Sequence, residues 1–219
     1  MRSDSIKQSS TPSPLNRRAL LAASLGAPAL LLASPHLLAQ IRAPLVRTPS
    51  QTEGPFYPAI EPDDHDHDLL RHGNLSYDKG QPCWMEGVVQ DLEGHPVAGA
   101  IVEIWQCDEA GNYRHPAQRG EVAKEFQGFG RVQVGADGRY RFRTIKPVPY
   151  SGRSPHIHVK VKLARRELLT TQMYVEGEPG NARDWLWRGL SEAQRAALTR
   201  PFVPGGDGPR AEFPLVVAA

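Results

Sequence analysis

Cysteine is scarce in this sequence, and several common metal-site patterns are absent. The two cysteines, Cys83 and Cys107, lack the paired spacing of a zinc ribbon, and no His-Glu-x-x-His motif of a zinc protease occurs. The chain also has no internal repeat and no heptad pattern. A disulfide between the two cysteines stays open, because sequence alone does not test its geometry.

Long apolar runs are also lacking, apart from one near the N-terminus. Arg17 and Arg18 precede an apolar, small-residue run at 19–33, and residues 37–39 end with a small residue suited to cleavage. This layout is typical of an export signal, and the paired arginines favour the twin-arginine route. An uncleaved anchor helix is the alternative, but the run is short for a membrane span. We therefore expect a signal peptide at 1–39, a periplasmic or otherwise exported protein, and no stable membrane anchor after cleavage.

An excess of basic charge disappears once the expected signal is set aside. The whole chain has a formal net charge of +2. Residues 40–219 contain 22 basic and 23 acidic side chains, so their net charge is −1. The basic character of the full chain therefore belongs partly to the signal, and we expect no nucleic-acid partner.

Many short strand patterns follow a loop-rich segment at 40–80. They are expected at 84–90, 100–106, 131–134, 140–144, 156–163, 168–175 and 211–217. An Asp-Gly turn at 137–138 predicts that the third and fourth of these strands form a hairpin. One short helix is expected at 191–198, where Ser191 and Gln194 fit a capping box. This pattern predicts an all-β sandwich domain over residues 81–219, with Trp105 packed inside it.

The sharpest local motif is the pair His156 and His158. In a strand, residues two apart point to the same face, so both imidazoles can bind one metal ion. Zinc, copper and iron all use such pairs. A solvated polar face is the alternative, because Lys160 and Lys162 share this side of the strand. No acidic residue follows at the spacing that a cupin-type site requires.

Two tyrosines lie at positions from which they can add ligands. Tyr113 ends the loop after the second expected strand, and Tyr150 lies in a proline-stiffened loop six residues before His156. A phenolate is a hard anionic donor that suits Fe3+, and a bound ferric ion keeps it deprotonated far below its free pKa near 10. Ordinary core or rim tyrosines are the alternative. The aspartate-rich stretch around His65 and His67 is a weaker metal candidate, and a solvated loop is favoured there.

Five ordered sequence blocks resemble the intradiol ring-cleavage dioxygenases, and protocatechuate 3,4-dioxygenase more than the catechol 1,2-dioxygenases. The blocks are Thr-Glu-Gly-Pro-Phe-Tyr-Pro at 52–58, the long stretch at 87–113, Thr-Ile-Lys-Pro-Val-Pro-Tyr at 144–150, Arg-Ser-Pro-His-Ile-His at 153–158 and Thr-Gln-Met-Tyr at 171–174. The resemblance implies a two-sheet β-sandwich of the transthyretin (prealbumin) type, with long loops and little helix.

The resemblance also implies a site and a reaction. It implies a mononuclear non-haem Fe3+ held by Tyr113, Tyr150, His156 and His158. It further implies that Tyr150 leaves when substrate binds, that Arg153 stabilises charge on the substrate ring and that Gln172 lies beside the site. The implied reaction inserts O2 between the two hydroxylated carbons of a catechol-type, protocatechuate-like substrate and gives a cis,cis-muconate-type diacid, with no organic cofactor.

Two other interpretations stay open from the residues themselves. One is a different two-histidine metalloenzyme, such as a copper or zinc hydrolase or oxidase, in which the tyrosines take no part. The other is a transthyretin-like binding module without catalysis, for which the complete set of four ligands is not expected. The loop between Tyr150 and His156 is short beside many relatives and contains Ser154-Pro155, so the shape of the substrate pocket is not predicted. Oligomeric assembly is also left open.

Overall fold

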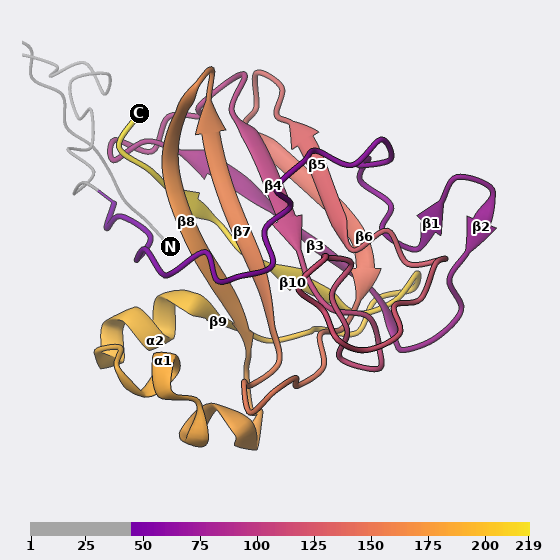
Figure 1. The fold of residues 1–219 in the computed structure, drawn as a ribbon. Helices are drawn as coiled ribbons and strands as arrows, with labels where there is room; N and C mark the ends of the chain where they lie inside the picture. The colour runs from indigo at the N-terminus through magenta and orange to yellow at the C-terminus, as the bar shows by residue number, and fades with distance from the viewer. Residues whose placement is uncertain (1–44) are drawn as a thin grey trace, which may run out of the picture. The chain divides into compact units, whose positions relative to one another are not determined.

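Residues 45–219 of this chain are described by a computed structural model, and they form a β-sandwich with few helices (Figure 1). The two sheets enclose the main hydrophobic core, which confirms the all-β prediction. The expected signal peptide lies outside the described residues. Within the described part of the chain, no helix is long and apolar enough to span a membrane.

The larger sheet has five strands in the order β5-β4-β7-β8-β9. Its members are β4 (Ile101–Trp105), β5 (Phe129–Gln133), β7 (His156–Leu163), β8 (Arg166–Val175) and β9 (Thr199–Arg200). All neighbours are antiparallel except β8 and β9. In β7 the apolar residues Ile157, Val159 and Val161 enter the core, so His156 and His158 lie on the outer face of this sheet.

The smaller sheet is built around β3 (Pro82–Gln90). On one side β3 pairs antiparallel with β6 (Arg139–Ile145), and on the other it pairs parallel with β10 (Arg210–Glu212) and β11 (Leu215–Val216). The single strand expected at 211–217 is therefore divided in two, because Pro214 has no N–H for the ladder. A separate two-stranded pair consists of β1 (Arg71–His72) and β2 (Leu75–Ser76).

The predicted hairpin between the third and fourth strands is wrong. The two strands, β5 and β6, are consecutive in the chain, but β5 pairs with β4 and β6 pairs with β3, so they belong to different sheets. The Asp-Gly turn does reverse the chain, with Gly138 at φ 68°. It is held by the Gly138 carbonyl, which accepts from the Val89 amide of the smaller sheet. A turn signal thus predicts a reversal, but not which strand the returning segment pairs with.

Three short helical segments connect β8 to β9 and lie near one end of β8 (Figure 1). They are the 3₁₀ turn η2 (Pro179–Arg183), α1 (Trp185–Arg188) and α2 (Glu192–Leu198). The capping box predicted for α2 is confirmed: the Ser191 hydroxyl accepts from the Gln194 amide, and the Gln194 side chain accepts from the Ser191 amide. The sequence did not predict η2 or α1, which are each only about one turn long.

The first described residues, 45–58, form a strap that bonds β11 and the turn after β3 at its start and then crosses the outer face of the larger sheet. Figure 1 shows this indigo segment crossing β8 and β7. The Gln51 amide donates to the Thr170 carbonyl over 2.8 Å, and the Gln172 side chain donates to the Thr52 carbonyl over 3.0 Å. Lys160 beneath the strap is only 4% exposed and pairs with Glu53. The outer face of β7 is therefore covered, and the solvated-face alternative for the two histidines is wrong.

Candidate active site

The two histidines turn their Nε2 atoms toward each other at the start of β7. Their Nε2 atoms are 3.1 Å apart. The Nδ1 atom of His156 donates to the Ser154 carbonyl over 2.6 Å, which leaves its Nε2 lone pair available as a ligand. Burial and the nearby Arg153 cation lower the pKa of His156 to about 4, and burial lowers the pKa of His158 well below 6.5. Both imidazoles are therefore neutral, as metal binding requires.

The two tyrosines converge on the same point. Tyr113 is 2% exposed, and its ring centroid lies 4.9 Å from that of Tyr150 and 6.0 Å from that of His158. Tyr150 lies 5.3 Å from His156 by the same measure. Burial raises the pKa of both phenols, so without a cation each stays protonated near neutral pH. The structure thus brings all four sequence-predicted ligands together.

An unsatisfied polar atom marks this cluster as a binding site. The buried Tyr113 hydroxyl has no hydrogen-bond partner among the described residues. Leaving such an atom unpaired costs about 1–3 kcal/mol, so it usually signals a bound group. No group of three or more His, Cys, Asp or Glu side chains within residues 45–219 is arranged to hold a metal. Two phenol oxygens and two imidazole nitrogens fit a hard trivalent cation that tyrosines help to ligate.

A tight turn explains why Tyr150 and Arg153 lie side by side. The Arg153 amide donates to the Tyr150 carbonyl over 2.7 Å, and both central residues have positive φ, 44° at Ser151 and 78° at Gly152. This is the backbone of a type I′ turn, which favours glycine at its second central position. Pro149 stiffens the approach to the turn. The two side chains needed at the site therefore leave the turn as neighbours.

The guanidinium of Arg153 is held by three side chains behind the turn. Its Nε donates to the Asp184 carboxylate over 2.8 Å, and one Nη atom donates to the Gln172 side chain over 2.7 Å and to the Tyr174 hydroxyl over 3.2 Å. Gln172 was predicted from the sequence to lie near the site, and it does. Asp184 and Tyr174 were missed. In the sequence, Asp184 looks only like the N-cap of a short helix. Tyr174 looks like one more core residue of a strand.

Aromatic rings close the side of the cluster that faces the strap. Phe56 stacks on Tyr113 with a centroid distance of 4.4 Å, and Trp105 stacks on His158 at 4.8 Å. Tyr57 packs edge-on against Trp105 at 5.0 Å. Trp105 was expected inside the sandwich. It is buried, but in a second cluster on the outer face, where its ring fixes the orientation of His158.

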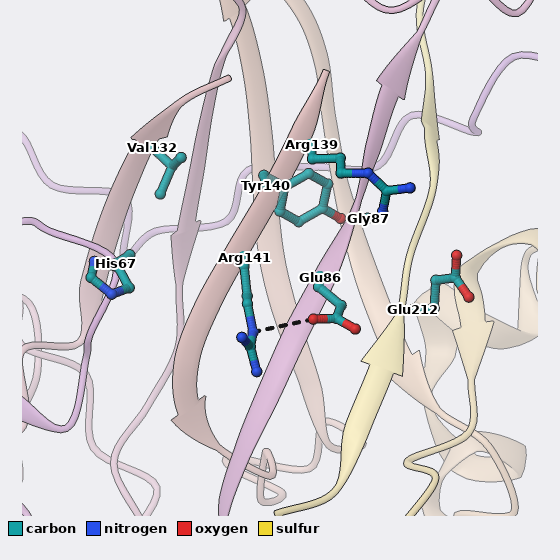
Figure 2. Close-up of a pocket in the computed structure, with 8 residues that line it drawn as sticks. All are labelled: His67, Glu86, Gly87, Val132, Arg139, Tyr140, Arg141 and Glu212. Carbon is teal, nitrogen blue, oxygen red and sulfur yellow. Dashed lines mark ion pairs between the residues drawn. The ribbon is translucent and has the colours of Figure 1, made fainter. Parts of the chain in front are cut away.

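A depression of about 270 Å³ lies beside the cluster and meets it at Tyr150. It is lined by residues 149–154 together with Glu178, Gly180 and Arg183. A larger depression of about 470 Å³ lies along β6 and β3, in the other sheet (Figure 2). Figure 2 shows its Arg141 paired with Glu86, and His67 is its one imidazole. Its lining includes one histidine and one tyrosine, and not the two of each that meet at the cluster, so we place the active site beside the smaller depression.

The remaining candidates from the sequence have ordinary structural roles. Cys83 and Cys107 are both free and buried, so the disulfide left open by the sequence is not formed. The His65 ring bonds the Pro62 carbonyl over 2.7 Å and pairs with Glu61 at 3.4 Å. These contacts are those of a loop-stabilising histidine, as the solvated-loop interpretation expects.

Comparison with known proteins identifies the family. A family model described as Dioxygenase matches residues 52–199. The beta chain of protocatechuate 3,4-dioxygenase from Burkholderia cepacia is 35% identical over 161 residues, 68% of each chain. Catechol 1,2-dioxygenase 1 from Acinetobacter lwoffii is 34% identical over 173 residues, which are 70% of this chain but 53% of that one, so this chain spans about half the length of that relative. The solved dioxygenase domain of a dioxygenase and carbohydrate-binding fusion from Streptomyces sp. SirexAA-E is 32% identical, with a TM-score of 0.62 over 78% of this chain and 97% of that one. This chain therefore belongs to the intradiol ring-cleavage dioxygenase family.

Proposed function

We propose that this protein cleaves a catechol-type diol between its hydroxylated carbons with O2, at a mononuclear non-haem Fe3+ held by Tyr113, Tyr150, His156 and His158. The observation that carries the proposal is the meeting of two imidazole Nε2 atoms, 3.1 Å apart, with the unpartnered, buried hydroxyl of Tyr113. When bound, Fe3+ supplies Lewis-acid activation of the diol and the charge that keeps the tyrosines ionised. The product is a cis,cis-muconate-type diacid.

The two tyrosines are placed for different tasks. Tyr113 is almost fully enclosed and stacks on Phe56, so its position is fixed by packing. Tyr150 lines the solvent-accessible depression and is only partly buried. An incoming diol therefore meets Tyr150 first. With Fe3+ bound, Tyr150 would be the ligand nearest the entering diol, and its phenolate oxygen would take up a diol proton.

Arg153 supplies the positive charge next to the substrate. It lines the same depression as Tyr150, and its side chain is only 12% exposed. A cation held in a poorly hydrated site stabilises negative charge on a deprotonated diol more strongly than one in water. Gln172 and Tyr174 hold one Nη atom of this guanidinium, so Arg153 does not need to reorganise when charge develops.

The rim of the depression supports an acid-substituted diol as substrate. Arg183 lines it opposite the turn that carries Tyr150, together with Arg153. Glu178 is the one acid among the lining residues. Two guanidinium groups at the mouth favour a ring with an anionic substituent, which agrees with a protocatechuate-like substrate. The similarity to a protocatechuate 3,4-dioxygenase chain supports the same choice.

Visible absorption and metal analysis of the purified protein test this function. We expect about one iron per chain, a red-brown colour from tyrosinate-to-Fe3+ charge transfer, and a shift of that band when a catechol is added without O2. Tyr113→Phe should lose most of the band, whereas the matched variant Tyr140→Phe, on the other sheet, should keep it. A protein that stays colourless after ferric reconstitution, or that retains zinc or copper instead, would refute the proposal.

A further inference from the structure

Asp184 is a fully buried carboxylate that joins three parts of the molecule. Its Oδ2 atom accepts from Arg153 Nε over 2.8 Å and from the Ser154 amide over 2.9 Å. Its Oδ1 atom accepts from the Leu186 and Trp187 amides over 2.9 and 3.1 Å, as the N-cap of α1. The side chain has no solvent exposure. A buried charge with this many donors is fixed in both position and orientation.

Two of these contacts lead directly to the site. Nε and one Nη atom of Arg153 are bonded to Asp184 and to Gln172, which fixes the plane of the guanidinium. The Ser154 amide bonds Asp184, and the carbonyl of the same residue accepts from His156 Nδ1. One carboxylate therefore holds both the substrate-facing cation and the backbone that sets the His156 tautomer.

We propose that Asp184 is a positioning residue for catalysis, which orients Arg153 toward the substrate and fixes the Ser154 backbone behind His156. The expected effect on kcat/KM rests on the proposed function. The orientation of Arg153 by Asp184 does not depend on it. The competing explanation is that Asp184 serves only as the helix cap of α1. The two explanations differ in what happens when the charge is removed and the cap is kept.

Asp184→Asn separates these two roles. Asparagine is as good an N-cap as aspartate, so the Oδ1 contacts to α1 survive. With that oxygen on α1, its NH2 group faces the Arg153 guanidinium and the Ser154 amide, so both of these contacts are lost. We expect kcat/KM to fall roughly 10- to 100-fold, the range for loss of a hydrogen bond between charged groups. The tyrosinate band should stay close to that of the native protein, because Tyr113 is held by stacking on Phe56 and has no contact with Asp184.

Two further variants complete the set. Asp184→Glu keeps the charge and should recover part of kcat/KM. Ser191→Ala removes the cap of α2 in the same helical insertion and has no contact with Arg153, so it should lower stability slightly and leave kcat/KM unchanged. If Ser191→Ala loses as much activity as Asp184→Asn, general loosening of the insertion explains the result and the proposal is wrong.

A measurement on the iron-free protein separates this proposal from the proposed function. In proton–nitrogen NMR spectra, the Arg153 Nε–H should exchange slowly with water in the native chain and in Ser191→Ala, and rapidly in Asp184→Asn. An unchanged exchange rate in Asp184→Asn overturns the proposal, and so does an unchanged kcat/KM despite faster exchange. If the native chain is colourless and consumes no O2, the proposed function fails, while the exchange rates still decide whether Asp184 positions Arg153.

Discussion

Replacing Tyr174 with phenylalanine removes a single buried hydroxyl that the site depends on. Tyr174 has no solvent exposure, and its hydroxyl donates to the Gln51 side chain over 2.8 Å and accepts from Arg153 over 3.2 Å. The first bond is between neutral groups and is worth about 0.5–1.5 kcal/mol, and the second involves a charge and is worth about 1.5–3 kcal/mol. The expected loss in the free energy of unfolding is therefore about 2–4 kcal/mol.

Calorimetry and O2-uptake kinetics measure the two consequences of Tyr174→Phe. For a domain of this size, about 2–4 °C of melting temperature is lost per kcal/mol, so Tm should fall by about 4–16 °C. kcat/KM should also fall, because Arg153 loses one of its three holding groups. Tyr140→Phe is the matched control: Tyr140 is buried in the other sheet and donates to the Phe213 carbonyl, so its loss should lower Tm and leave kcat/KM unchanged. A Tyr174→Phe protein with native Tm, or equal losses of activity in both variants, would refute the reasoning.

Three further predictions concern the turn, the thiols and pH. Ser151→Asn should raise the free energy of unfolding by about 0.5–1 kcal/mol in urea titrations, because asparagine tolerates the positive φ of this turn better than serine. Burial raises the pKa of Cys83 and of Cys107 to about 12, so an alkylating reagent at mildly alkaline pH should label neither thiol in the native protein and both in denaturant. Burial opposes the charge of Asp184, but hydrogen bonds from the Ser154 amide and Arg153 outweigh it and lower its pKa. Its stabilisation is therefore complete above the unfolded pKa of about 3.9 and is lost as pH falls through the folded pKa, so acid unfolding of Asp184→Asn should depend less steeply on pH than that of the native chain.

Local patterns in the sequence predicted those elements whose cause is local. The alternation at 156–163 is β7, and the capping box at Ser191 begins α2. The pairing of β7 with β8 also has a local cause, since a short connection favours adjacent antiparallel strands. The four converging residues were predicted as ligands because each belongs to a sequence block that resembles the family. The spacing of the two histidines alone did not distinguish a metal site from a polar face.

Features that depend on distant parts of the chain were not predictable in this way. β5 pairs with β4 because both sheets bury their apolar faces in the core between them, and the turn that follows β5 does not determine this pairing. The strap at 45–58 has no periodicity, so nothing in its sequence predicts that it covers Lys160 and the two histidines. Asp184 looks like an ordinary cap before a short helix. Its link to Arg153 appears only when segments 31 residues apart are brought together.

The strap also determines when the site is completed during synthesis. Residues 51–52 bond residues 172–174, which follow them by 120 residues or more. The strap leaves the ribosome before the rest of the described chain. It therefore docks only after most of the sandwich has been synthesised. Contacts at such separation carry a large loop-closure entropy and form late in folding. Until the strap docks, the face of β7 that carries the two histidines stays open to water.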